Sequence, residues 1–375
     1  MGRLKMASLF EAMGYTNERA HTGMICYMLQ LFNEGNKKPF ESFMQKLHPN
    51  FEKPAGYIAA IPEYRKIDLV ITNQDHKPIA AFEMKVDSHE HQCKIRGKNE
   101  WKAQTEVYAG RLEDENDDDQ TPGKRFFVTL GVGEFYADPK GGGFRHRGLS
   151  VFTAAVQAAV ECSTGIEKIL LKDWLEMLKN EIRIRDLIAD RRYDDVPRKD
   201  ELRKGLWNAC VLGSIRDALL KRDEIPEGPT INLREGYDPR FYLHGSAPDT
   251  ILNIWWMPVR DSDNVEYLYT EVNNNGKLNL KVQFSSNCGT KREREPVLEK
   301  GRRAIDRVLC ELPDGILDVC PQSRNGKTQT LATIDIGLQK ASEGLRLAGG
   351  RTAETAADRI IQVINRLEDD RDIML

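Results

Sequence analysis

Two segments, Lys66-Ile-Asp-Leu-Val-Ile-Thr72 and Pro78-Ile-Ala-Ala-Phe-Glu-Met-Lys-Val86, decide the fold that this chain is expected to adopt. Both are rich in β-branched and apolar residues, and the polar residues between them predict a turn centred between Asp75 and His76. In the resulting hairpin, one face carries the pairs Ile67–Met84, Leu69–Phe82 and Ile71–Ala80, and the other carries Val70–Ala81, Thr72–Ile79 and Asp68–Glu83.

The second face of this hairpin joins two acids and a lysine. Residues directly opposite one another have Cβ atoms about 5 Å apart, so Asp68 and Glu83 are expected to be neighbours. Lys85 follows Glu83 by two positions and projects from the same face. The rest of both faces is apolar, so the acids are expected to be buried, where they repel each other and lose hydration.

A divalent cation held by carboxylate oxygens would compensate these charges, because Lys85 supplies only one positive charge against two negative ones. A metal beside an ammonium group suits phosphodiester hydrolysis. The alternative is a buried Asp68–Lys85 ion pair, with Glu83 at a sheet edge.

These residues resemble the core of the PD-(D/E)XK nuclease superfamily, whose fold is a mixed sheet flanked by helices. Asp68 matches the first acid, although Ile67 stands where the family has proline; Glu83 and Lys85 match the second acid and the lysine. The resemblance covers about residues 10–190. It implies a metal site formed by Asp68, Glu83 and the main-chain carbonyl of Met84, filled by Mg²⁺, for which Mn²⁺ can substitute.

Gln104 and Tyr108, spaced four residues apart on a predicted helix over 98–112, share one helix face. They resemble a Gln-x-x-x-Tyr element that follows the core in several branches and orients substrate or the lysine. The alternative is a solvent-facing glutamine beside a core tyrosine.

Glu18 begins the segment Glu18-Arg-Ala-His-Thr22, which resembles a helix of a bacterial branch whose glutamate completes the metal site. A helix is predicted over 17–33, and Ile25 belongs to its apolar stripe. A step of seven residues back from Ile25 places Glu18 on the buried side of that helix. The alternative is an acid in the first turn that the helix dipole stabilises.

Composition is ordinary for a soluble protein: 375 residues, 40% hydrophobic, 30% charged and a net charge of −3. The net charge indicates no general field for a polyanion, so nucleic-acid binding would depend on local patches. Seven scattered cysteines without a Cys-x-x-Cys pair, no membrane-length apolar run and no signal-peptide core favour a cytoplasmic protein without a membrane partner. The motif His89-x-His91-x-Cys93 lacks a fourth ligand with zinc-site spacing, so zinc is not expected.

The predicted fold class is α/β, with a restriction-endonuclease-like domain over 1–190, a helical linker over 191–229 and an α+β domain with antiparallel strands over 230–375. Further elements are expected as a strand at 125–130, a glycine-rich basic loop at 139–148, helices at 149–161, 167–188 and about 206–220, strands at 249–259, 264–273 and 277–285, a helix at 295–310, a hairpin around Asn325-Gly326 and a helix at 352–368. The loop, which holds Lys140 to Arg147, suits either phosphate contact or simple mobility.

The sequence therefore predicts a Mg²⁺-dependent nuclease that hydrolyses DNA, as an endonuclease, with restriction or anti-phage defence as its setting by analogy. Its C-terminal domain is expected to supply substrate recognition or homodimerisation. Two alternatives stay open: a nuclease acting on RNA, and a non-catalytic nucleic-acid-binding or assembly protein that keeps the fold.

Overall fold

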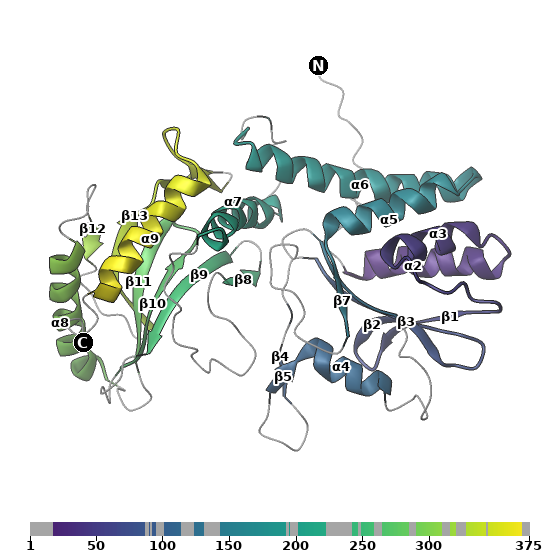
Figure 1. Ribbon diagram of the computed structural model, residues 1–375, viewed down its shortest axis with the longest axis horizontal. Helices are drawn as coiled ribbons and strands as arrows, with labels where there is room; N and C mark the ends of the chain where they lie inside the picture. The colour runs from purple at the N-terminus through teal and green to yellow at the C-terminus, as the bar shows by residue number, and fades with distance from the viewer. Residues whose placement is uncertain are drawn as a thin grey trace. The chain divides into compact units, whose positions relative to one another are not determined.

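The computed structural model describes residues 18–86, 90, 92–94, 101–113, 124–130, 143–192, 195, 202–222, 242–246, 249–258, 265–284, 290–309, 316–319, 328–342 and 344–369. The chain divides into two compact units, Met1–Asp186 and Leu187–Leu375. The first is a mixed α/β unit and the second carries antiparallel sheets, so the coarse fold class predicted from the sequence is confirmed (Figure 1).

A five-stranded mixed sheet forms the centre of the first unit, in the order β1-β2-β3-β6-β7. Its strands are β1 (Ala59–Tyr64), β2 (Ile67–Thr72), β3 (Pro78–Lys85), β6 (Lys124–Thr129) and β7 (Arg145–Arg147). The first three are antiparallel, whereas β6 and β7 run parallel to β3. A further short pair, β4 (Gln92–Lys94) with β5 (Trp101–Ala103), is antiparallel.

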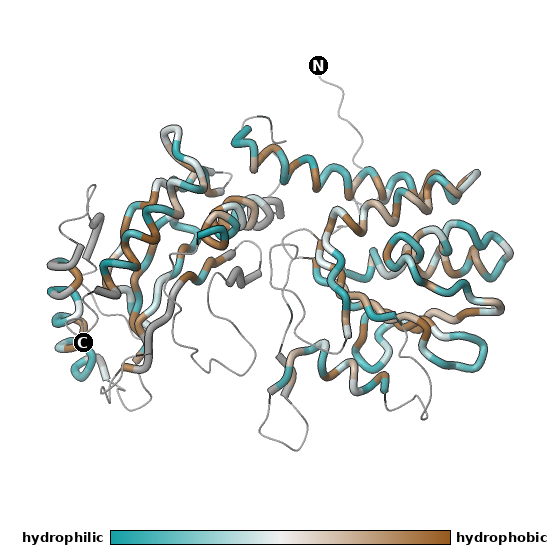
Figure 2. The backbone as a smooth tube through the Cα atoms, viewed as in Figure 1, coloured by the Kyte–Doolittle hydropathy of each residue, from teal (hydrophilic) through white to brown (hydrophobic). Residues whose placement is uncertain are grey.

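Helices cover both faces of this sheet (Figure 1). One face packs against α2 (Glu18–Asn33), α3 (Lys38–Leu47), α5 (Leu149–Glu161) and α6 (Gly165–Ala189), and the other against α4 (Gln104–Glu113). Phe82 and Phe126 lie in the larger core, while Phe127 lies in the smaller one beside Tyr108. Figure 2 shows the central strands as hydrophobic stretches and the helices as alternating hydrophobic and hydrophilic residues.

The predicted hairpin register is confirmed at Leu69–Phe82, Val70–Ala81 and Ile71–Ala80. It is wrong at one end, because an irregularity pairs Thr72 with Pro78 and not with Ile79. Ile67 also differs from expectation. It follows the tight turn from β1 and packs with Tyr64 in the smaller core, and so does not belong to the face that carries Met84.

Several expected boundaries in the first unit need correction. The segment predicted as a helix over 98–112 contains β5, and its helix, α4, begins only at Gln104. Within the expected loop at 139–148, residues 145–147 form the edge strand β7; residues 139–142 lie outside the described part. Strand β1 and helix α3 were not predicted as separate elements.

The second unit is built on a six-stranded antiparallel sheet in the order β12-β13-β11-β10-β9-β8. Its strands are β8 (Tyr242–Ser246), β9 (Asp249–Pro258), β10 (Val265–Val272), β11 (Lys277–Phe284), β12 (Ile316–Val319) and β13 (Thr328–Asp335). It also contains helices α8 (Lys291–Leu309) and α9 (Ala353–Asp369), and a short pair formed by β14 (Leu338–Lys340) and β15 (Leu345–Leu347).

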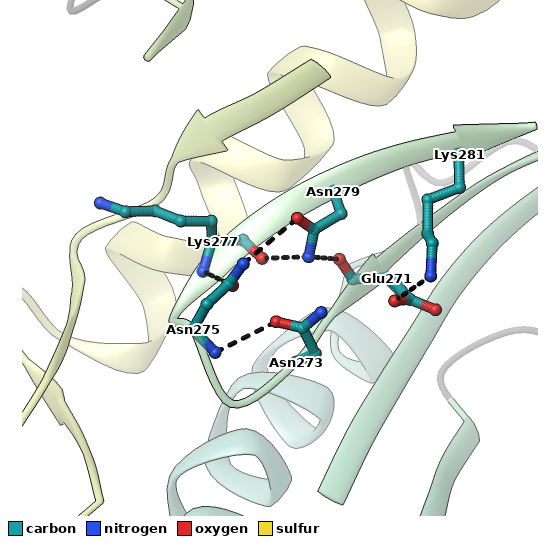
Figure 3. Close-up of polar contacts among 6 residues, drawn as sticks. All are labelled: Glu271, Asn273, Asn275, Lys277, Asn279 and Lys281. Atoms are coloured by element: carbon teal, nitrogen blue, oxygen red, sulfur yellow. Dashed lines mark hydrogen bonds and ion pairs between the residues drawn. The ribbon is translucent and has the colours of Figure 1, made fainter. Parts of the chain in front are cut away.

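The Asn-Gly turn between β10 and β11 forms as predicted. Gly276 has a φ of +75°, and the Asn273 and Asn275 side chains accept hydrogen bonds from the main chain two residues ahead (Figure 3). The second predicted turn, Asn325-Gly326, lies outside the described residues, although β12 and β13 are antiparallel.

Helix α7 (Leu202–Leu220) occupies the region that the sequence assigned to a linker. It packs against α9, β9 and β15, and Trp207 Nε1 donates a hydrogen bond of 2.6 Å to the Leu345 carbonyl. The neighbouring Asn208 side chain accepts a hydrogen bond from Leu345 N. The helix therefore belongs to the second unit and does not connect two domains.

Candidate active site

The end of the β2–β3 hairpin brings three predicted residues together. Asp68 is the second residue of β2, and Glu83 and Lys85 lie at the end of β3. The ladder between these strands reaches Leu69 and Phe82; beyond it, the Asp68 carboxylate accepts a 2.7 Å hydrogen bond from Met84 N. A side chain thus binds the main chain of β3 at the point where this strand pairs with β6 on its other side.

Glu83 and Lys85 form a buried ion pair, with 2.5 Å between Lys85 Nζ and Glu83 Oε1. Their side chains are only 1% and 5% exposed, because β3 is the middle strand of the sheet. Lys85 therefore pairs with Glu83 and not with Asp68, and Glu83 does not lie at a sheet edge. Both details exclude the alternative interpretation of a simple Asp68–Lys85 pair.

The second oxygen of Glu83, Oε2, is buried and has no hydrogen-bond partner among the residues that the structure describes. A buried carboxylate oxygen without a partner carries a desolvation penalty of about 1–3 kcal/mol or more. Burial raises the pKa of Glu83 to about 8, and the charge of Asp68 adds to this effect, although Lys85 opposes it. Burial likewise raises the pKa of Asp68 to about 6. Ionising both carboxyl groups is therefore unfavourable here unless a further positive charge is present.

Glu18, the first residue of α2, is half-buried and lines the same cleft as Asp68. Its negative charge contributes to the raised pKa values of Asp68, Glu83 and Lys85. However, among the described residues no three His, Cys, Asp or Glu side chains converge as a group able to hold a metal ion. Glu18 therefore acts on the acidic pair through its charge and does not complete a three-carboxylate cage in this conformation.

Gln104 and Tyr108 lie on the buried face of α4, as their spacing predicts. Gln104 Nε2 donates a hydrogen bond of 2.7 Å to the Tyr108 hydroxyl, and both residues are buried. Burial and the charge of Glu83 raise the pKa of Tyr108 to about 12. Gln104 is thus not exposed to solvent, and Tyr108 lies close enough to Glu83 to sense its charge.

Two supporting contacts were not found from the sequence. Buried Glu90 accepts hydrogen bonds from the main chain and hydroxyl of Thr105, so it caps the first turn of α4. Thr129, which pairs with Lys85 across the parallel ladder, shares a 2.6 Å hydrogen bond with His146 Nε2. No local sequence pattern marks Glu90 as a cap of α4. His146, in contrast, lies in the basic segment for which the sequence suggested phosphate contact.

The arrangement fits a hard cation. Asp68 and Glu83 offer carboxylate oxygens, the ligand type that Mg²⁺ prefers, and Glu83 Oε2 lacks any other partner. His89 and His91 of the zinc-like motif lie outside the described residues. Within the described part, no helix is both long and apolar enough to cross a membrane.

Comparison with known proteins found no matching family model, no similar curated protein and no similar solved structure.

Proposed function

We propose that the first unit is a restriction-endonuclease-like nuclease domain that hydrolyses phosphodiester bonds, most readily those of DNA, with Mg²⁺ as its cofactor. The observation that carries this proposal is the buried Glu83 Oε2, without a partner, beside Lys85 and close to Asp68. A purely structural acid–lysine pair gains nothing from a second acid nearby, whereas a cation site requires one.

In this proposal Asp68, Glu83 and the Met84 carbonyl hold the cation, with Glu18 contributing through its charge. A bound Mg²⁺ supplies a Lewis acid for the phosphate and lowers the pKa of water. Lys85 keeps its proton, because the neighbouring carboxylates raise its pKa. Its ammonium group therefore orients the attacking water and stabilises the negative charge that develops on the phosphate. Tyr108, which accepts the hydrogen bond from Gln104, lies near enough to Lys85 for the ammonium charge to oppose the rise in its pKa that burial causes.

The direct test incubates the protein with plasmid, linear duplex, single-stranded DNA and RNA, each with Mg²⁺, Mn²⁺ or chelator. We expect cleavage of DNA with either metal and none with chelator. Cleavage that persists in the Glu83→Gln variant, or in chelator, would contradict the assignment. Cleavage of RNA alone would retain the chemistry and change the substrate.

The second candidate is a nucleic-acid-binding protein without catalysis. It is favoured by the finding that the described residues form no ready group of three metal-ligating side chains. Calorimetric titration with Mn²⁺ separates the two candidates: binding that disappears in Glu83→Gln supports the nuclease, and no binding in the presence of DNA supports the second candidate.

A further inference from the structure

A cleft of about 730 Å³ opens beside Asp68 in the first unit. Helix α2 forms one wall, with Arg19 and Gly23, and the end of β1 with the turn that follows it forms the other, with Glu63 and Lys66. The volume lies within the range of about 300–1,000 Å³ that is usual for small-ligand sites. A space of this size has room for a short stretch of one nucleic-acid strand.

Gly23 has no structural reason to be glycine. It lies inside α2 with a helical backbone, and a Cβ atom there would meet nothing within 4 Å. Glycine inside a helix costs about 0.5–1 kcal/mol relative to alanine. The visible consequence of its missing side chain is room in the cleft. Gly110 in α4 is an equally open helical glycine that does not line the cleft, so it offers a matched control.

The two cations of the cleft stand on opposite walls. Arg19 reaches across to Glu63 in a 2.5 Å ion pair whose side chains are 77% and 62% exposed. Exposed pairs of this kind contribute about 0.2–1 kcal/mol, so a phosphate can replace Glu63 as the partner of Arg19. Lys66 forms no ion pair with any residue that the structure describes, and it is exposed.

Lys66 is held in place by an uncommon main-chain conformation. The two-residue turn that joins β1 to β2 consists of Arg65 and Lys66, with φ values of +50° and +72°. Asparagine and glycine usually occupy such turns, because other residues are strained there by about 1–2 kcal/mol each. Reciprocal hydrogen bonds between Arg65 and Arg111 of α4 secure the turn.

We propose that this cleft binds a single strand of nucleic acid, with Arg19 and Lys66 contacting its backbone phosphates from opposite walls and Gly23 leaving the space for it. The proposal rests on the proposed nuclease function, because the bound strand would pass next to Asp68. It also specifies that function further: the substrate is a free end, a displaced strand or another unpaired stretch.

The test measures binding of a fluorescent single-stranded DNA oligonucleotide by anisotropy, in chelator and in a Glu83→Gln background that keeps the probe intact. Gly23→Leu is expected to weaken binding at least tenfold, and Gly110→Leu to change it less than twofold. Both leucines improve helix propensity, so neither variant should melt below its parent.

Charge variants test the same cleft without filling it. Arg19→Gln and Lys66→Gln should each lower the slope of log K against log salt by about 0.7, the value for one phosphate contact on a single strand. Glu63→Gln should have the opposite effect and tighten binding several-fold, because it releases Arg19 and removes a negative charge.

Equal binding by the Gly23→Leu and Gly110→Leu variants would overturn the proposal, as would unchanged salt slopes or an affinity for duplex equal to that for the single strand. Activity assays with Mg²⁺ separate this failure from that of the nuclease. If cleavage requires Glu83 but the cleft variants bind the single strand as their parent does, the cleft proposal alone is refuted. If binding depends on the cleft residues but no metal supports cleavage, the nuclease proposal alone is refuted.

Discussion

Each unit of this protein has a glutamate paired with a lysine on the strands of its sheet, and the two pairs differ in informative ways. Glu83 and Lys85 lie on one strand, with one carboxylate oxygen buried and unpartnered. Glu271 and Lys281 lie diagonally on neighbouring strands, 2.8 Å apart (Figure 3). Lys281 Nζ also lies 5.7 Å from the centre of the Tyr269 ring. Neither oxygen of Glu271 is both buried and unpartnered.

The two pairs differ in how fully the hydrogen-bonding capacity and the charge of the glutamate are satisfied. The side chains of Glu271 and Lys281 are 6% and 21% exposed, so water reaches the lysine. The two opposite charges neutralise each other as a cross-strand pair. Glu83 Oε2 has no hydrogen-bond partner among the described residues, and the charges of Asp68 and Glu18 raise the pKa of Glu83 further. An acid–lysine pair in a sheet is therefore not evidence of catalysis by itself; the proposed catalysis depends on the unpartnered Glu83 oxygen and on the nearby acids.

The largest expected effect is a difference in cleavage rate between variants of Glu83 and of Glu271. Glu83→Gln removes a proposed metal ligand and should reduce cleavage by at least about a thousandfold, while Glu271→Gln should leave the cleavage rate unchanged. The measurement is initial rate on DNA at saturating Mg²⁺. Similar losses in both variants would show that the comparison is mistaken and that both pairs serve folding.

The second-largest expected effect is a difference in cleavage rate between variants of Lys85 and of Lys281. Lys85→Met is expected to lower the cleavage rate about a hundredfold or more while Mn²⁺ binding by calorimetry survives, because the lysine stabilises charge and does not hold the cation. Lys281→Met is the matched control and should leave both quantities unchanged. If metal binding and folding disappear together in Lys85→Met, the lysine is a structural counter-ion.

Stability should respond to pH through Glu83 in the metal-free protein. The pKa of Glu83 is about 8 in the fold against 4.5 in the unfolded chain, so the folded state binds this proton more tightly. The resulting stabilisation is complete below pH 4.5 and is lost as the pH rises through 8. At about 1.4 kcal/mol for each pKa unit, the loss is on the order of 5 kcal/mol.

This prediction is checked by urea unfolding in chelator between pH 5 and about 8.5. Wild type should lose stability relative to Glu83→Gln over this range, and Mg²⁺ should restore it at the upper end. Glu271→Gln should instead lower stability by about 1–3 kcal/mol at neutral pH, because Lys281 loses its charged partner. A constant difference between wild type and Glu83→Gln at all pH values would contradict the account.

Local patterns in the sequence predicted the hairpin, the shared face of Glu83 and Lys85, and the shared helix face of Gln104 and Tyr108, because strand and helix periodicity determine each of them. The structure adds what depends on distant contacts. The burial of Glu83 was expected from the apolar faces of the hairpin, but the parallel pairing of β6 with β3, which makes β3 the middle strand, was not. The capping of α4 by Glu90 spans fifteen residues and has no local signal either. Ile67 was misplaced because a tight turn of two non-glycine residues was not expected before it.

The smallest expected effect concerns two buried tyrosines, one near each acid–lysine pair. Tyr108→Phe removes the acceptor of the Gln104 amide, whereas Tyr269→Phe removes a hydroxyl that is hydrogen-bonded to Thr328. Each change should cost about 1 kcal/mol of unfolding free energy. Only Tyr108→Phe should also slow cleavage, by up to about tenfold, because Gln104 then loses its orientation beside Lys85. Equal cleavage rates in the two variants would show that the Gln104–Tyr108 hydrogen bond only stabilises the core. The proposed site would then consist of Asp68, Glu83 and Lys85.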